Sequence, residues 1–248
     1  MTKKYTAFIS DIHLQQDAEY TTELFTLFAT HMKNKLERLF ILGDLFEYWI
    51  GDDDKNKFHS QIIAQFRELS DHGVDLFFMA GNRDFLIGKK FLKAIGAKKL
   101  PDPCPINLYG RSMILMHGDL LCTNDHKYLK FRKVVSNKFI QKLFLLMPLF
   151  LRRRIANKLR KSSREYMREI PKDYLDVTEQ GVQEAFRVFT REVLIHGHTH
   201  KPGEHKLSMK KKRIVLGAWH NEGSMVICNK NLAPKLIKFN SKKQLEAL

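Results

Sequence analysis

Apolar residues occur in two kinds of segment that alternate along the first 116 residues of the chain. Short, nearly continuous apolar runs, which are typical of buried strands, occupy residues 5–9, 39–42, 74–80 and 111–116. Longer segments with apolar residues at helical spacing occupy residues 20–36, 57–71 and 88–95. This alternation predicts an α/β fold in which helices cover a sheet.

The same pattern returns near the C-terminus. A predicted helix over residues 176–190 leads to a predicted strand over 192–195. Further strands are predicted over residues 213–219, 224–228 and 234–239. We therefore expect one α/β core made of residues 1–122 and 176–248, with residues 123–175 inserted into it.

The inserted part differs in charge and in pattern from the core. Residues 127–172 hold fifteen lysines or arginines and two acidic residues, and they carry +13 of the net charge of +16. Residues 139–151 within it are mostly apolar, but a bilayer-spanning helix needs about 20 residues. We predict a helical lid that contacts lipid through residues 139–151 and an anionic membrane through its basic rim, Arg152–Arg154 included. The alternative is helices that pack on the core and expose a basic face to solvent.

The composition of the chain limits its possible binding partners and the cell compartment in which it is expected. The net charge of +16 indicates an anionic partner, which can be nucleic acid, a phospholipid surface or a phosphorylated substrate. Three widely spaced cysteines, Cys104, Cys122 and Cys228, give neither a disulfide framework nor a zinc pattern, so a reducing cytosol is expected. The first strand starts directly after Lys4, and we expect no removable signal peptide before it.

Polar residues that can bind metal follow five of the predicted strands. Histidine, aspartate and asparagine form a hard-to-borderline set of ligands that suits Mn²⁺, Mg²⁺, iron or Zn²⁺. Without cysteine, it is not a soft thiolate site. Seven such ligands exceed the needs of one ion, so we expect two ions bridged by Asp44. In an extended segment, Asp11 and His13 would point to the same face. The predicted ligands are Asp11, His13, Asp44, Asn82, His117, His196 and His198.

The ordered motifs DIH, GDLFE, GNRD, HGD and HGHTH resemble those of the calcineurin-like metallophosphoesterases. The resemblance implies a β-sandwich flanked by helices, in α/β/β/α order, with an inserted helical lid. It also implies two metal sites that share Asp44. One site would use Asp11, His13, Asp44 and His198, and the other Asp44, Asn82, His117 and His196.

One residue departs from the usual pattern of this family. Most members have histidine after the asparagine of the third motif, where it assists an alcohol leaving group, whereas this chain has Arg83. Arginine does not donate a proton usefully at neutral pH, but it can hold a phosphate through two parallel hydrogen bonds. A phosphate leaving from a pyrophosphate needs no such proton. The change therefore favours a pyrophosphate bond as the substrate.

Longer stretches, GDLFEYWIGDD, AGNRDFLIG, MHGDLLCTND and LGAWHNEGSM, resemble a narrower group of pyrophosphohydrolases in lipid A biosynthesis. This resemblance implies Mn²⁺-dependent release of UMP from a nucleotide-linked diacyl sugar, by a peripheral enzyme on the cytoplasmic face of the inner membrane. We favour a monomer. The implied catalytic residues are Asp44, Asn82, Arg83 and His117. The implied substrate-binding residues are Asn82, Arg83, Asp125, Ser163, Met167, Ile170 and His196. Met167 and Ile170 stand where the group carries asparagine and lysine, and Arg168 or Lys172 could make these contacts instead.

Two other functions remain open at this point. A nuclease or another phosphodiesterase could use the same two-metal core, and a net charge of +16 suits a nucleic-acid backbone. Against this, the charge lies beside an aliphatic run rather than along a groove with stacking aromatics. A non-catalytic membrane-binding scaffold would use the basic helices alone. The complete ligand set argues against it.

Overall fold

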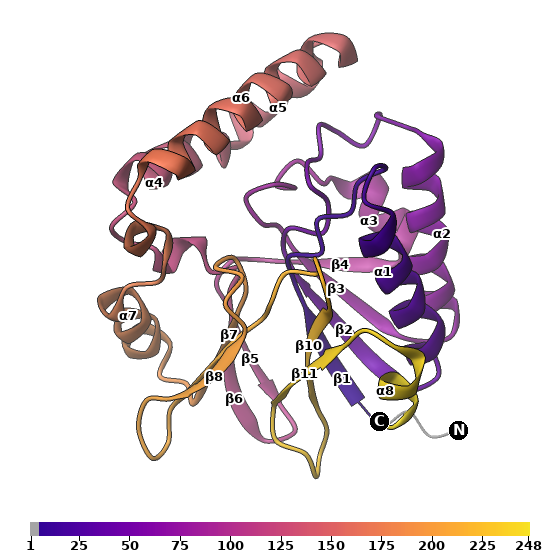
Figure 1. The fold of residues 1–248 in the computed structure, drawn as a ribbon, viewed down its shortest axis with the longest axis vertical. Helices are drawn as coiled ribbons and strands as arrows, with labels where there is room; N and C mark the ends of the chain where they lie inside the picture. The colour runs from indigo at the N-terminus through magenta and orange to yellow at the C-terminus, as the bar shows by residue number, and fades with distance from the viewer. Residues whose placement is uncertain (1–4) are drawn as a thin grey trace.

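Two β-sheets lie face to face in the computed structural model, which describes residues 5–248 except for the side chains of residues 172 and 173. Helices cover the outer face of each sheet, and a group of three helices extends over one end of the sandwich (Figure 1). The β-sandwich flanked by helices that the family resemblance implied is confirmed.

The first sheet, in the described residues, has six strands in the order β11-β10-β1-β2-β3-β4. Its parallel strands are β1 (Tyr5–Ile9), β2 (Leu36–Leu42), β3 (Asp75–Met79) and β4 (Ala97–Leu100). Two antiparallel strands, β10 (Gly223–Cys228) and β11 (Lys235–Phe239), complete one edge. The helices on its outer face are α1 (Glu19–Met32), α2 (Lys57–Asp71), α3 (Lys89–Ile95) and α8 (Lys242–Glu246).

The second sheet has five strands within the same residues, in the order β5-β6-β7-β9-β8. They are β5 (Cys104–Leu108), β6 (Arg111–Leu115), β7 (Val193–His196), β8 (Gly203–Lys206) and β9 (Lys212–Val215). Helix α7 (Glu179–Phe189) and the short 3₁₀ helix η1 (Asp119–Leu121) pack on its outer face. A second 3₁₀ helix, η2 (Lys172–Leu175), precedes α7.

Alternate residues of each central strand belong to different cores. In β1, Ala7 and Ile9 face the helices, whereas Phe8 faces the second sheet. The rings of Phe8, Phe40 and Phe77 from three neighbouring strands stack in the interior of the sandwich, with centroids 5.0 and 4.6 Å apart. Burial on both faces explains why these strands read as continuous apolar runs rather than as alternating ones.

Some element boundaries differ from the sequence predictions. The helix predicted over residues 20–36 ends at Met32, and Leu36 starts β2. Leu36 lies four residues after Met32, so it fits the helical spacing although it belongs to the strand. Strand β5 occupies part of the loop that Pro101–Pro105 suggested, and its edge position tolerates Pro105. The short elements β4, β8 and α8 were not predicted.

The lid consists of α4 (His126–Val135), α5 (Lys138–Leu146) and α6 (Leu149–Glu169), between η1 and η2. The mostly apolar run 139–151 is divided because α5 ends before Pro148, which is the N-terminal cap of α6. Figure 1 shows α6 running across the top of the molecule, above the loops at the ends of the strands. Among the helices of the described part of the chain, none combines the length and the apolar content needed to span a bilayer.

Candidate metal centre and lid pocket

The loops after the central strands of both sheets meet at one end of the sandwich. After β1 and β2, the amide of Asp11 donates to the carbonyl of Gly43 at 3.1 Å, and that of His13 to the carbonyl of Asp44 at 3.0 Å. The amide of His198, which follows β7 in the other sheet, donates to Asp11 Oδ2 at 2.9 Å. The parallel pairing of β1 with β2 and of β6 with β7 therefore brings polar residues from both sheets together.

The backbone of these loops is strained at the candidate ligands. Seven non-glycine residues in the described chain have positive φ, and five of them are Asp11, His13, Asp44, His198 and His200, at 53° to 70°. Such values are uncommon for residues with a side chain and concentrate at functional sites. The expected extended geometry between Asp11 and His13 is therefore wrong, because both residues lie in the left-handed region.

Two glycines, Gly81 and Gly197, allow the carboxylates of Asp44 and Asp11 to lie close to the backbone of neighbouring loops. A Cβ on Gly81 would lie 2.2 Å from Asp44 Oδ1, and one on Gly197 would lie 2.1 Å from Asp11 Oδ2. Both separations are far below van der Waals contact. Any larger residue at Gly81 or Gly197 would displace a candidate ligand.

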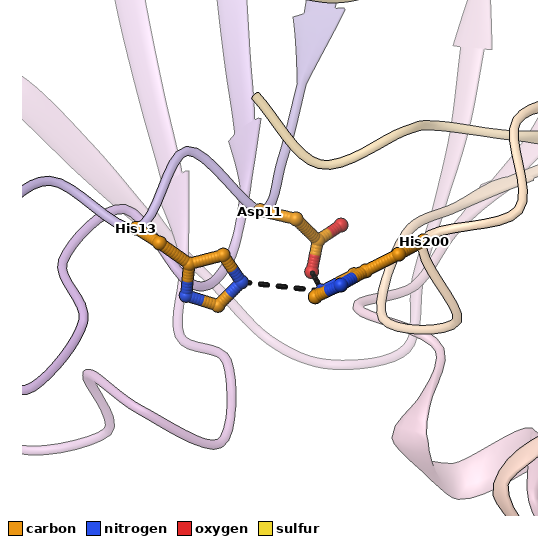
Figure 2. Close-up of side chains that lie close together, drawn as sticks. All are labelled: Asp11, His13 and His200. Atoms are coloured by element: carbon orange, nitrogen blue, oxygen red, sulfur yellow. Dashed lines mark hydrogen bonds and ion pairs between the residues drawn. The ribbon is translucent and has the colours of Figure 1, made fainter. Parts of the chain in front are cut away.

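The first group of possible metal ligands is Asp11, His13 and His200, whose side chains point toward one another in Figure 2. The Nε2 atoms of His13 and His200 are 3.2 Å apart, and His200 Nε2 lies 3.5 Å from Asp11 Oδ1. Two ring nitrogens can face each other so closely only if a proton or a cation lies between them. His200 was absent from the predicted ligand set.

The second group is Asp11, Asp44 and His117, and Asn82 and His198 adjoin it. Asn82 Oδ1 lies 2.8 Å from His117 Nε2 and 3.0 Å from His198 Nδ1. Asp44 faces both groups, because its Oδ2 is 4.0 Å from His13 Nε2 and its Oδ1 is 3.7 Å from His117 Nε2. This position suits the bridging role predicted for Asp44.

His196 is placed differently from the other predicted ligands. It is the last residue of β7 and is fully buried. Its Nδ1 lies 2.9 Å from the carbonyl oxygen of Gly197, and its Nε2 lies 3.4 Å from the guanidinium of Arg213. The structure thus brings His200, rather than the predicted His198, to Asp11 and His13, and it places His196 in neither group of possible ligands. The predicted ligand and substrate roles of His196 do not fit this geometry.

The electrostatics of the cluster favour a cation. Burial alone would lower the pKa of His117, but Asp44 and three other carboxylates raise its pKa to about 9. His117 Nδ1 donates to the carbonyl of Leu42 at 2.9 Å, which directs Nε2 toward the other ligands. Burial and the charge of His117 lower the pKa of His198 to about 4, so that ring is neutral and able to bind a metal. The donor set therefore fits hard or borderline divalent ions.

Asp84, the last residue of the GNRD motif, supports the loops instead of joining the cluster. It is fully buried, and its two oxygens accept from the amides of Gly81 at 2.8 Å and Leu45 at 2.7 Å. The carboxylate thereby ties the loop that carries Asn82 to the loop that carries Asp44.

A pocket of about 340 Å³ lies between the lid and the core, next to the cluster. Asn82 and Arg83 line it together with apolar side chains from both parts. The apolar side chains include Phe85 and Leu86 of the core and Ile140, Phe144, Ile155 and Leu159 of the lid. The volume lies within the usual range for small-molecule sites, and the mixture of an apolar wall with a few polar groups is typical of them.

The four predicted lid contacts differ in position. Ser163 lines the pocket. Asp125 caps α4 by accepting from the amide of Tyr128 at 2.9 Å, and it also accepts from the hydroxyl of Tyr166 at 2.8 Å. Neither Met167 nor Ile170 is among the described residues that line the pocket. The structure therefore places only Ser163 of these four in the pocket wall.

Charged pairs join the lid to the core, and they correct the prediction for Arg152. Arg152 is 2% exposed; it donates to the carbonyl of Ile50 at 2.6 Å and pairs with Asp53. Arg153 pairs with Asp54 at 2.5 Å. Arg152 therefore fastens the lid to the core and is not part of an exposed basic rim. The lid also joins the core through Arg132, which pairs with Asp102 at 2.9 Å and with Asp119.

Comparisons with known proteins agree with this geometry. The family model for calcineurin-like phosphoesterases matches residues 5–202. A protein named UDP-2,3-diacylglucosamine hydrolase from Salmonella arizonae is 46% identical over 224 residues, which cover 89% of this chain and 93% of the relative. A protein of the same name from Enterobacter sp. is 47% identical with the same coverage.

A solved structure shares the fold at low sequence identity. It is described as an archaeal phosphodiesterase and superposes with a TM-score of 0.51 at 13% identity, covering 95% of this chain and 99% of the other. The match of the family model over most of the chain, and the high identity to two full-length relatives, agree with the motifs and the fold. This chain belongs to the calcineurin-like phosphoesterase family.

Proposed function

We propose that this chain hydrolyses the pyrophosphate bond of UDP-2,3-diacylglucosamine, giving UMP and 2,3-diacylglucosamine 1-phosphate for lipid A biosynthesis. The observation that carries the proposal is the pocket that Asn82 and Arg83 share with apolar side chains of the lid. A substrate that joins a pyrophosphate to acyl chains needs polar and apolar walls side by side. The names of the relatives that cover most of this chain point to the same substrate.

The cluster would hold two divalent ions, for which we propose Mn²⁺. Asp11, His13, Asp44 and His200 would bind one ion. Asp44, Asn82, His117 and His198 would bind the other. When bound, such ions activate a water molecule and stabilise the negative charge that develops on a phosphoryl oxygen. In this proposal His200 takes the place that the family resemblance gave to His198, and His198 takes the place that it gave to His196.

The chain's own residues would position the pyrophosphate. Arg83 lies beside the cluster because its amide donates to Asp44 Oδ1 at 2.8 Å, and its side chain reaches the pocket. Arg160 reaches the same pocket from α6 of the lid. Two guanidinium groups, one from the core and one from the lid, suit a second phosphate, which each can contact through two hydrogen bonds. The lid above them would limit the access of water to the reacting bond.

The outer surface of α5 would dock on the membrane that supplies the lipid. Leu146 of α5 is 78% exposed, Phe139 and Leu143 of α5 are also exposed, and Phe150 at the start of α6 is 72% exposed. The lysines Lys138 and Lys142 of α5 are exposed beside them. Apolar side chains flanked by lysines are typical of helices that lie in an anionic membrane surface. We therefore propose a peripheral position on the cytoplasmic face of the inner membrane.

Two pairs of substitutions should separate substrate binding from membrane binding. Phe144→Ser with Ile155→Ser changes the pocket wall, whereas Leu143→Ser with Leu146→Ser changes only exposed positions. The pocket pair should raise KM for the diacylated substrate at least about tenfold, because each buried methylene contributes about 0.8 kcal/mol and about 1.4 kcal/mol is tenfold. It should leave KM for a deacylated analogue nearly unchanged.

The exposed pair is the matched control for the pocket pair. It should reduce sedimentation with anionic vesicles while retaining the preference for the diacylated substrate. If the pocket pair keeps that preference while its thermal unfolding remains cooperative, the acyl chains do not enter the pocket. If the exposed pair sediments as the unchanged protein does, α5 is not the docking surface.

A further inference from the structure

Glu47 lies where the metal cluster, the pocket and the lid meet. It follows β2 in a loop whose position is fixed by a parallel bridge between Leu14 and Phe46. Its own amide donates to the carbonyl of Leu14 at 3.1 Å, and the fully buried side chain of Leu14 anchors that segment. Glu47 is therefore held against the loop that carries Asp11 and His13. The sequence analysis assigned it no role.

One carboxylate oxygen of Glu47 faces a candidate metal ligand. Its Oε2 lies 3.2 Å from Nδ1 of His13, whose ring is almost fully buried. The opposite ring nitrogen, Nε2, lies 3.2 Å from His200 and 4.0 Å from Asp44. The negative charge of a carboxylate this close to Nδ1 favours the tautomer with the proton on that atom, which leaves the lone pair of Nε2 for the cluster. Metal-binding histidines generally depend on such a partner for their orientation and basicity.

The other oxygen of Glu47 faces two arginines from different parts of the chain. Its Oε1 lies 2.8 Å from a terminal nitrogen of Arg160 in α6 and 3.4 Å from a terminal nitrogen of Arg83. The guanidinium of Arg160 also lies over the ring of Tyr48, 4.8 Å from its centroid. Both arginines line the lid pocket. A single carboxylate thus fixes a core arginine and a lid arginine at the same wall.

We infer that Glu47 is a positioning residue that orients His13 for metal binding with one oxygen and holds Arg83 and Arg160 at the pocket with the other. Metal affinity and lid position then depend on the same side chain. The inference deepens the proposed function and rests on it for the identity of the substrate. The interaction with His13 concerns the metal alone and can be measured without any substrate.

The test uses Glu47→Gln, which keeps the size of the side chain and removes its charge. Titration calorimetry of the metal-free protein with Mn²⁺ should show affinity weakened about 10- to 100-fold, the usual effect of losing such a partner. KM for UDP-2,3-diacylglucosamine should also rise, because Arg83 and Arg160 lose their common anion. Arg160→Met should raise KM without changing Mn²⁺ affinity. This result would separate the effect of Glu47 Oε1 on the arginines from the effect of Oε2 on His13.

Two further variants control for a general loss of structure. Glu184→Gln removes a carboxylate that pairs with Arg187 on an exposed face of α7, and it should change neither quantity. Glu47→Asp keeps the charge but is one methylene shorter, so it cannot reach both sides; it should fold and still bind Mn²⁺ more weakly. This variant carries the test if Glu47→Gln does not fold.

The outcomes separate this inference from the proposed function. Unchanged Mn²⁺ affinity in folded Glu47→Gln or Glu47→Asp overturns the inference, whatever happens to KM. Weakened Mn²⁺ affinity without any change in KM overturns the part that concerns the arginines. If the unchanged protein does not hydrolyse the nucleotide-linked lipid while Glu47→Gln still weakens Mn²⁺ binding, the proposed substrate is wrong and the role of Glu47 toward His13 stands.

Discussion

Replacing Asp44 with asparagine is expected to lower kcat/KM by at least about 100-fold, which corresponds to about 2.7 kcal/mol of transition-state stabilisation. Asp44 is the carboxylate that faces a histidine of each ligand group, His13 on one side and His117 on the other. Asparagine has nearly the same size but no charge, so both proposed metal sites would lose an anionic ligand at once. Steady-state kinetics at saturating Mn²⁺ measure the effect.

The fold should survive this change, because the amide oxygen of asparagine can still accept from the amide of Arg83, which now lies 2.8 Å from Asp44 Oδ1. Asp71→Asn at the exposed end of α2 is the control and should retain full activity. Circular dichroism and thermal unfolding should be similar for both variants. A purified Asp44→Asn protein that keeps more than about a tenth of the rate would show that Asp44 does not bridge two ions.

Replacing Arg83 with alanine is expected to lower kcat/KM by about 100-fold or more while leaving the pH profile in place. A loss of this size is typical when an enzyme loses one charged or polar group that stabilises developing charge in a site with little water. The guanidinium of arginine stays protonated across the working pH range, so its removal takes away a phosphate contact and no titrating acid. Initial rates measured from pH 6 to 9 would reveal both effects.

Arg83→Lys is the matched control, because it keeps the charge but loses the planar, two-pronged donor. It should recover part of the rate. A shift in the pH profile of Arg83→Ala would assign proton transfer to this residue, contrary to the proposal. Rapid hydrolysis of simple phosphomonoesters by the unchanged protein would also oppose it, since arginine gives no proton to an alcohol leaving group.

The position of the site was visible in the sequence because buried strands and polar residues alternate so regularly. Asp11, Asp44, His117 and His198 each lie two residues after the end of their strand, once the strand bounds are known. Apolar runs mark such strands without any structural information. The convergence of their ends follows from the parallel arrangement, which the alternation with helices also indicates.

The misplaced histidine shows what the sequence did not reveal. His196, His198 and His200 are equally spaced, and an extended segment would point all three to one face. In the structure His196 still pairs with Val215 in the sheet, whereas His198 and His200 take positive φ in the loop. One regularity could have favoured His200, because His198 and His200 repeat the spacing of Asp11 and His13.

The lid shows a second limit of prediction from the sequence, which concerns the pairing of charged side chains. The sequence analysis placed Arg152 in an exposed basic rim, and it named no partner for the acidic residues Asp53 and Asp54. In the structure Arg152 and Arg153 pair with Asp53 and Asp54. Counting charges along the chain cannot show which of them are paired, because the partners lie about a hundred residues apart. For residues 139–151 the sequence indicated an apolar run, but it did not show that Phe144 lines the pocket whereas Leu143 and Leu146 are exposed.

The most direct test of the proposed function is product analysis with the purified protein. Incubation with Mn²⁺ and UDP-2,3-diacylglucosamine should release UMP and 2,3-diacylglucosamine 1-phosphate, both detectable by mass spectrometry, and a chelator should stop the reaction. Single-stranded DNA incubated under the same conditions should remain intact. Cleavage of the DNA with no UMP released from the lipid substrate would contradict the account and assign the metal centre to a nuclease.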